Sequence, residues 1–213
     1  MQWLPLSMFR VLHWEYFCLV NIDKQKNVNM SRLKALEPAT TTGRSKDLFN
    51  AVQSKLGMVP NMMRTMGNSP AVLNGYLSLS GALGEGKLGH KLGALIAIAV
   101  ANANACVYCN AAHSFIGEKL AHIDLASIAD ARIGLSKDSK IQAALDFAIA
   151  LVKKKGEITD AEFSAVSNAG YDDAAIAEII AHVGLNILTN YFNKASQPLV
   201  DFPEVRLIET PAI

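Results

Sequence analysis

Two cysteines and a histidine stand within eight positions of the chain, in the stretch NACVYCNAAH that runs from Asn104 to His113. Cys106 and Cys109 are three positions apart, and His113 is four positions beyond Cys109. On a helix these separations place all three side chains on roughly one face. Two thiols beside an imidazole can cycle between dithiol and disulfide, contribute to a metal site, or simply be buried.

The three side chains favour redox chemistry over a zinc site and over simple burial. A closed structural zinc site takes about four ligands, and the sequence holds no second C-x-x-C to complete one, so we expect no metal and no cofactor. Burial of two inert thiols beside a core histidine is the simpler alternative. The redox interpretation needs a low-pKa thiolate, a resolving thiol and a proton donor, and the cluster supplies all three.

The residues before the cysteines predict how they are positioned. The alanine-rich stretch 90–104 is apolar almost all round, which is typical of a helix at the centre of a bundle. Asn104 and Ala105 separate it from the cysteines, which we therefore expect in the first turn of a new helix. Unpaired backbone amides and the helix dipole there lower a thiol pKa below its usual value of about 8.5.

Apolar residues elsewhere in the chain repeat with helical spacing, and no stretch alternates as a strand would. The sequence therefore predicts an all-α fold, a helical bundle of one domain that suits its 213 residues. The predicted helices lie within 45–58, 68–83, 90–104, 106–120, 125–134, 136–156, 159–170 and 172–196.

Composition excludes several classes of function. The 20 Lys and Arg balance 19 Asp and Glu, and no basic stripe with interleaved aromatics appears, so we expect no nucleic-acid partner. An odd count of three cysteines, two of them adjacent in space, favours a reducing cytoplasm over a secreted disulfide scaffold. We expect no membrane span, because no apolar run approaches the required length of about 18 to 20 residues.

The first 30 residues differ from the rest of the chain. They are rich in aromatics and are interrupted by charge, and they lack the basic start, continuous apolar segment and small-residue cleavage site of a signal peptide. The segment MSRLKALEP from Met30 reads like an ordinary protein start. We therefore predict that residues 1–30 are an extension outside the core and that the domain spans 31–213. An integral helix is the alternative.

The stretch LIAIAVANANACVYCNAAHSFIG (95–117) resembles the core motif of the carboxymuconolactone decarboxylase and alkyl hydroperoxidase D (AhpD)-like superfamily. The peroxidase-related branch of that superfamily has C-x-x-C-x-x-x-H after an apolar helix. The flanking stretches 55–83 and 185–203 are similar to the same family, so the resemblance extends over about residues 31 to 205.

The resemblance implies an all-helical homo-oligomer that acts as an antioxidant peroxidase and reduces hydroperoxides with a cycling dithiol. In the family pattern Cys109 attacks the peroxide and becomes a sulfenic acid, Cys106 resolves it as an intrachain disulfide, and His113 relays protons. The reductant would be a dithiol donor such as a lipoyl domain or a thioredoxin-like protein. Histidine titrates in the right pH range for this role.

One position departs from the family pattern. The family has a proton-relaying glutamate twelve positions before the first cysteine, where this chain has Ala94. Glu178 and His182, spaced i and i+4 on the last predicted helix, are candidate substitutes, although a pair at a helix surface or subunit interface is the simpler interpretation. Without a carboxylate, a non-catalytic redox-sensing subunit is one alternative function. A decarboxylase-type lyase acting on a carboxylated lactone is the other.

Three asparagines on the same predicted helix also follow helical spacing. Asn186, Asn190 and Asn193 form a polar seam in an otherwise apolar segment. Their amides can donate and accept hydrogen bonds. The sequence leaves open whether this seam lies beside the thiols or between subunits.

Overall fold

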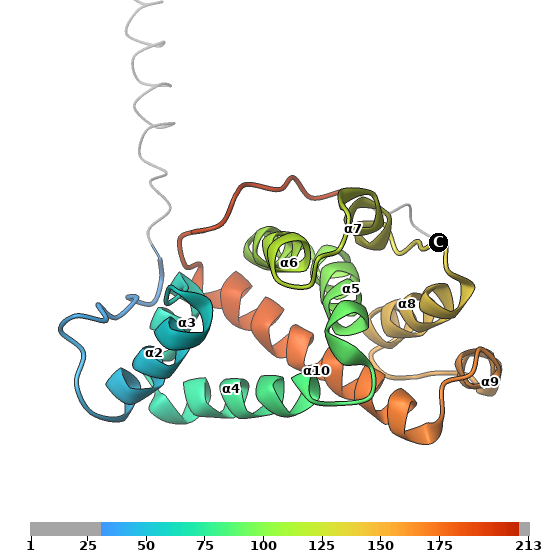
Figure 1. The fold of residues 1–213 in the computed structure, drawn as a ribbon, viewed down its shortest axis with the longest axis horizontal. Coiled ribbons are helices and arrows are strands. Elements are labelled where there is room, and N and C mark those ends of the chain that lie inside the picture. Colours follow the sequence, from blue (N-terminus) through green and yellow to red (C-terminus); the bar gives the residue numbers. More distant parts are fainter. Residues whose placement is uncertain (1–30, 209–213) are drawn as a thin grey trace, which may run out of the picture. The chain divides into compact units, whose positions relative to one another are not determined.

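The computed structural model describes residues 31–208, and within this range the chain forms nine helices and no strand (Figure 1). The all-α prediction is confirmed. The predicted extension over residues 1–30 lies outside the described residues. The helices are α2 (Gly43–Leu56), α3 (Asn61–Met66), α4 (Pro70–Gly84), α5 (Gly89–Ala103), α6 (Val107–Lys119), α7 (Leu125–Arg132), α8 (Ser139–Lys153), α9 (Asp160–Asn168) and α10 (Asp173–Ser196).

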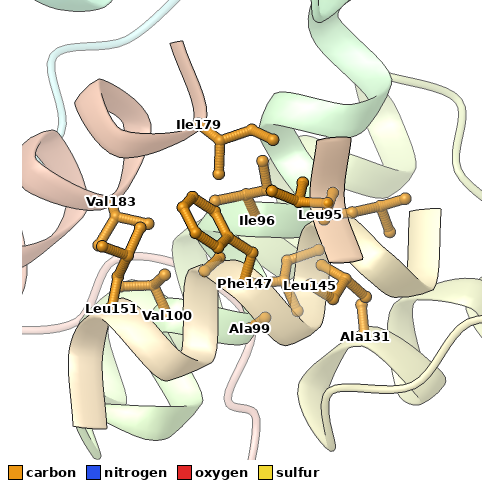
Figure 2. Packing of buried hydrophobic residues seen from close by; sticks show 14 of the residues in the cluster. Leu95, Ile96, Ala99, Val100, Ala131, Leu145, Phe147, Leu151, Ile179 and Val183 are labelled. Carbon is orange, nitrogen blue, oxygen red and sulfur yellow. The ribbon is translucent and has the colours of Figure 1, made fainter. Parts of the chain in front are cut away.

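Helix α5 lies at the centre of the bundle, as its apolar composition predicts. It packs against α6, α7, α8 and α10, and Ile96, Ile98 and Val100 are fully buried. Figure 2 shows Leu95 and Ile96 of α5 grouped with side chains from α8 and α10 around Phe147. A helix that contacts neighbours on every side has no face left for polar residues, which is why this segment shows so little amphipathic pattern.

A second apolar cluster lies between α2, α3, α4 and the start of α6. It contains both cysteines of the C-x-x-C pair together with Tyr108, and its other members come mainly from the helices that precede α5. These include the buried side chains Leu48, Phe49, Val52, Met62, Met63, Met66 and Leu73. The thiols are therefore part of a hydrophobic core and do not lie in an exposed loop.

Helix α10 is the longest element and differs in one respect from the sequence prediction. By length and composition alone it qualifies as a candidate membrane span, with a mean hydropathy of 1.2 over its most apolar window. Within the fold, however, it packs against α4, α5, α6 and α8. It also buries Asn186, Asn190 and Asn193. These contacts are those of a core helix in a bundle.

The segment that follows α10 runs back across α6 toward α7 without regular structure (Figure 1). We call residues 197–208 the C-terminal strap. Phe202 packs edge-on against Tyr108, with ring centroids 5.8 Å apart. At the far end, the Ile208 backbone exchanges two hydrogen bonds with the Asn102 side chain, at 2.9 and 3.2 Å. The strap thus covers one side of α6.

Candidate active site

A tight turn between α5 and α6 places the two cysteines. Ala105 adopts a left-handed conformation (φ 49°), and the Cys106 amide donates a hydrogen bond to the Ala101 carbonyl at 2.9 Å. Helix α10 holds the turn from outside, because Lys194 Nζ donates to the Asn104 carbonyl at 2.8 Å. Asn104 Nδ2 in turn donates to Asn190 Oδ1 at 2.9 Å.

Cys106 is the N-cap residue of α6, and Cys109 lies in its first turn, as predicted. The Cys106 sulfur accepts a hydrogen bond from the Cys109 backbone amide at 3.3 Å, in the position where a serine or aspartate oxygen usually caps a helix. The two sulfurs lie at disulfide distance, with Cα atoms 5.3 Å apart. The pair therefore needs no backbone rearrangement to cycle between dithiol and disulfide.

Cys109 lines a cavity in the described part of the chain. Cys109 and His113 line a pocket of about 90 Å³ with predominantly apolar walls, whereas Cys106 is not among its described lining residues. Methionines and aromatic rings dominate these walls: Met58, Met62, Met63, Tyr76, Tyr108, Phe115 and Phe202. A small apolar molecule in this pocket would meet the Cys109 sulfur and the His113 imidazole together.

His113 is a neutral imidazole in this environment. Burial lowers its pKa from the ordinary value of about 6.5 to about 4, and a hydrogen bond with the Asn186 side chain opposes this shift in part. Near neutral pH the side chain can therefore accept a proton. His113 therefore does not titrate near neutral pH as the sequence led us to expect, and as a weak base it can take a thiol proton only where the thiol pKa is also lowered.

The asparagine seam of α10 lies beside this site. Asn186 contacts His113, Asn190 contacts the turn that carries the cysteines, and Asn193 Nδ2 donates to the Cys109 sulfur at 3.2 Å. All three contacts are made within one chain, so the seam lies beside the thiol site of that chain.

Glu178 belongs to α10, and its side chain lies against the beginning of α5, away from the thiols. Its carboxylate accepts hydrogen bonds from the backbone amides of Lys87 and Leu88, both at 3.0 Å. The carboxylate thus satisfies amides that a helix start leaves without intrahelical partners. Glu178 is not among the described residues that line the pocket.

His182 lies one turn further along α10 and packs against Gly93 of α5. A Cβ at Gly93 would stand 2.8 Å from the His182 Cε1 atom. Burial lowers the pKa of His182, and the charge of Glu178 opposes this shift in part. The imidazole Nε2 is buried with no hydrogen-bond partner in the described part of the chain. Of the predicted site residues, the structure brings Cys106, Cys109 and His113 together, while Glu178 and His182 lie by the beginning of α5.

Two strap residues complete the site, and no sequence pattern marks them. The Tyr108 hydroxyl donates to Asp201 Oδ1 at 2.7 Å and accepts from the Met62 amide at 3.0 Å. Burial raises the pKa of Tyr108, so the hydroxyl stays protonated. Asp201 Oδ2 also accepts a hydrogen bond from the Asn61 backbone amide at 2.7 Å. These bonds fix Phe202 at the pocket wall, next to Phe115.

The described residues show no metal centre. Between residues 31 and 208, no three His, Cys, Asp or Glu side chains come together in a way that could hold an ion. The site is therefore described by its thiols, its imidazole and its apolar walls.

Comparison with known proteins identifies related folds. A family model described as "Carboxymuconolactone decarboxylase family" matches residues 70–150, which run from α4 into α8 and include the thiol site. No curated protein matches the sequence closely enough to be compared.

Several solved structures share the fold. A peroxidase-related protein from Silicibacter sp. TM1040 is 26% identical, with a TM-score of 0.71 over 79% of this chain and 91% of that protein. An AhpD-core, peroxidase-related protein from Ralstonia eutropha JMP134 is 25% identical, with a TM-score of 0.73 over 80% of this chain and 92% of that one. The debrominase Bmp8 is 22% identical, with a TM-score of 0.68 over 83% of this chain and 94% of its own, and its likeness concerns the fold alone.

Proposed function

The chain belongs to the carboxymuconolactone decarboxylase and AhpD-like superfamily, and on this premise we propose that it is a thiol-dependent hydroperoxide reductase. One observation carries the proposal. The Cys109 sulfur lines an apolar pocket that it shares with His113, and it lies at disulfide distance from Cys106. This arrangement supplies a nucleophile, a base and a resolving thiol to any small hydroperoxide in the pocket.

The oxidative step begins at Cys109. His113 accepts the thiol proton, and the resulting thiolate attacks the distal oxygen of the hydroperoxide. The O–O bond breaks as the S–O bond forms, and the departing alkoxide takes the proton from the His113 imidazolium. Two electrons pass from sulfur to the peroxide, which leaves Cys109 as a sulfenic acid and releases an alcohol.

The second step closes the disulfide. The Cys106 thiol attacks the Cys109 sulfenic acid, water leaves, and the Cys106–Cys109 disulfide forms. A dithiol donor, such as a lipoyl domain or a thioredoxin-like protein, then attacks the disulfide, passes through a mixed disulfide and leaves both cysteines reduced. The donor itself ends as a disulfide, so each cycle consumes one dithiol for each hydroperoxide.

The proton relay of this cycle ends at His113. Ala94 has no titratable group and cannot relay a proton. The Glu178 carboxylate accepts hydrogen bonds from two backbone amides. The neutral His113 imidazole, held by Asn186, can take the thiol proton and return it to the leaving alkoxide. Glu178 and His182 then act on the relay only through their packing against the beginning of α5.

The lining of the pocket also bears on the lyase alternative. A carboxylated lactone carries a negative charge, and burying it requires a cationic or hydrogen-bonding partner. No lysine or arginine is among the described lining residues, so the pocket offers a carboxylate hydrogen-bonding groups such as Asn193 but no cationic partner. The apolar walls instead suit an uncharged hydroperoxide with an organic substituent.

We propose that the working unit is a homo-oligomer in a reducing compartment such as the cytoplasm. Val72 and Leu79 of α4 and Ile180 and Leu188 of α10 are each more than two-fifths exposed, although all are large and apolar. Helices α4 and α10 pack against each other, and a second copy is a suitable cover for such a surface. Light scattering on the purified protein measures the subunit number, and a monomer would contradict this proposal.

A peroxide titration tests the proposed function. Reduced protein is treated with cumene or tert-butyl hydroperoxide, and mass spectrometry is used to look for a Cys106–Cys109 disulfide. Cys109→Ser should abolish disulfide formation, whereas Cys18→Ser, which changes the cysteine outside the described residues, should leave it unchanged. Turnover is then measured with a lipoyl domain or a thioredoxin as donor.

The outcomes separate the candidate functions. A peroxide-dependent disulfide with multiple turnovers supports the reductase. A disulfide that forms once and is not recycled by any dithiol donor favours the redox-sensing subunit. Absence of any peroxide-dependent disulfide would overturn both and leave the lyase as the remaining candidate.

A further inference from the structure

The Asn193 side chain contacts the Cys109 sulfur and lines the same apolar pocket. It is 4% exposed and is one of the few polar residues that line the cavity. Its Nδ2 donates to the Cys109 sulfur and to the Met62 sulfur, both at 3.2 Å. Its Oδ1 is buried and has no hydrogen-bond partner within residues 31–208.

An unpartnered amide oxygen in a core is unfavourable, because the oxygen loses its water and gains no replacement. The polar groups nearby do not supply a donor. The Tyr108 hydroxyl donates to Asp201, and both sulfurs beside Asn193 act as acceptors. Because less than 1 Å² of the oxygen is accessible, a ligand O–H in the pocket would satisfy it once the surrounding side chains shift slightly.

We propose that Asn193 holds both reactants of the oxidative step, donating from Nδ2 to the Cys109 sulfur and accepting at Oδ1 the O–H of the hydroperoxide. The proposal rests on the proposed function and assigns a substrate-contacting residue to it. The donor and acceptor belong to one planar amide, so the sulfur and the distal oxygen are held side by side. Such placement of reacting atoms accounts for a large part of many enzymatic rate enhancements.

The chemistry of the step is consistent with this arrangement. The Cys109 thiolate attacks the distal oxygen, the O–O bond breaks, and the alkoxide is protonated by His113. The hydrogen on the distal oxygen stays there and becomes the sulfenic acid hydrogen. Asn193 Oδ1 can therefore keep one hydrogen bond from the bound peroxide to the product. Meanwhile the Nδ2 contact favours the thiolate over the thiol, because hydrogen bonding to a charged form lowers its free energy.

The test separates the two contacts. In a Cys18→Ser, Cys106→Ser background, Cys109 is the only thiol left in the chain. Alkylation by iodoacetamide across pH gives the thiol pKa and the intrinsic reactivity of the thiolate. Trapping of the sulfenic acid with dimedone gives the rate constant for cumene hydroperoxide. The reacting carbon of iodoacetamide carries no hydrogen-bond donor, whereas the reacting oxygen of the peroxide does, so the Oδ1 contact should affect the peroxide rate more than the alkylation rate.

Asn193→Leu removes both contacts at nearly constant volume. We expect the thiol pKa to rise. We then compare the two proteins at a pH above the Cys109 pKa of both the parental protein and the Asn193→Leu variant. There we expect the rate with cumene hydroperoxide to fall about tenfold relative to the alkylation rate. Asn110→Leu is the matched control, because Asn110 is also buried with an unpartnered Oδ1, but its Nδ2 donates to the Cys106 carbonyl and not to a sulfur, and it is not among the described lining residues. Its ratio of the two rates should not change.

Asn193→Asp keeps the size of the side chain and serves if the leucine variant does not fold. The carboxylate loses the donor and places a negative charge beside the sulfur, so the thiol pKa should rise. An unchanged thiol pKa in this variant, an unchanged rate ratio in Asn193→Leu, or an equal loss in Asn110→Leu would each overturn the proposal. A parental protein that forms no sulfenic acid with any hydroperoxide would instead overturn the proposed function, and the alkylation data would still report on the Nδ2 contact.

Discussion

The Cys109 backbone amide donates its hydrogen bond to the Cys106 sulfur, so the two sulfurs of one disulfide have different environments. Cys106 caps α6 and is screened from the pocket. Cys109 faces the pocket and the Asn193 amide. A sulfur that accepts from a helix N-terminal amide is the better leaving group, because its thiolate is stabilised there. Both cysteines are buried, but Cys109 lines the pocket and is therefore the sulfur that an incoming thiolate can reach.

We therefore predict that a reductant attacks Cys109 and releases Cys106 as the thiolate. Oxidised Cys18→Ser protein is mixed with excess glutathione, quenched in acid and alkylated, and the peptides are mapped by mass spectrometry. Glutathione should be found on Cys109 and the alkyl group on Cys106. The reverse labelling pattern would contradict the assigned order of attack.

The buried imidazole of His113 predicts a loss of stability in acid. Its pKa is about 4 in the folded chain and about 6.5 when unfolded. Between these values the unfolded chain binds the proton and the folded chain does not. The free energy of unfolding should therefore fall as the pH decreases from about 6.5 toward 4, by up to about 1.4 kcal/mol per pH unit from this residue.

Urea unfolding at pH 7 and pH 5 measures this effect. His113→Gln should reduce the difference between the two pH values, and His182→Gln should also reduce it, because burial lowers the pKa of His182 as well. The exposed His90 provides the control, and His90→Gln should retain the full difference. An undiminished difference in His113→Gln would show that this imidazole is protonated in the folded state.

Removal of the Tyr108 hydroxyl should loosen the strap. Tyr108→Phe leaves the buried Met62 amide without its acceptor and Asp201 without one donor. We expect a loss of about 1 to 3 kcal/mol in the free energy of unfolding, with faster proteolysis after residue 197. Tyr191 is 62% exposed, so Tyr191→Phe should change stability by less than about 0.5 kcal/mol. Equal effects of the two substitutions would argue against the strap contact.

Close packing of α5 against α10 predicts opposite effects for two glycine substitutions. A Cβ at Gly93 would stand 2.8 Å from His182 Cε1, so Gly93→Ala should destabilise the fold by about 1 to 3 kcal/mol. Adding His182→Ala should recover part of that loss. A Cβ at Gly75, inside α4, would have no atom within 4 Å, and Gly75→Ala should stabilise by about 0.5 to 1 kcal/mol. Thermal unfolding of these variants and of the parental protein measures whether each substitution lowers or raises the stability as predicted.

The helices and the thiol cluster could be predicted because both depend on short-range pattern. Helical periodicity located α5 and α10, and the spacing of Cys109 and His113 placed both on the side of α6 that lines the pocket, whereas Cys106 is the N-cap of that helix. Helix α3 is only six residues long, which is too short to show a period, and it was not predicted. The apolar run of α10 is interrupted by asparagines, which concealed how far it resembles a membrane span.

Other features depend on contacts between distant parts of the chain. Glu178 bonds to the amides of residues 87 and 88 only because α10 passes the beginning of α5. Asp201 reaches Tyr108 only because the strap crosses α6. Neither contact leaves a local pattern of residue types. The sequence could thus identify the candidate residues of the site, but not which sulfur faces the pocket.

The strap also has a consequence for biosynthesis. Residues 197–208 follow all of the described helices in the chain, yet Phe202 forms part of the pocket wall. Synthesis that stopped after α10 would therefore leave the thiol pocket without its last side. A chain cut between α10 and Asp201 would keep its helices but present Cys109 to bulk solvent, where any oxidant or thiol in the cell could react with it.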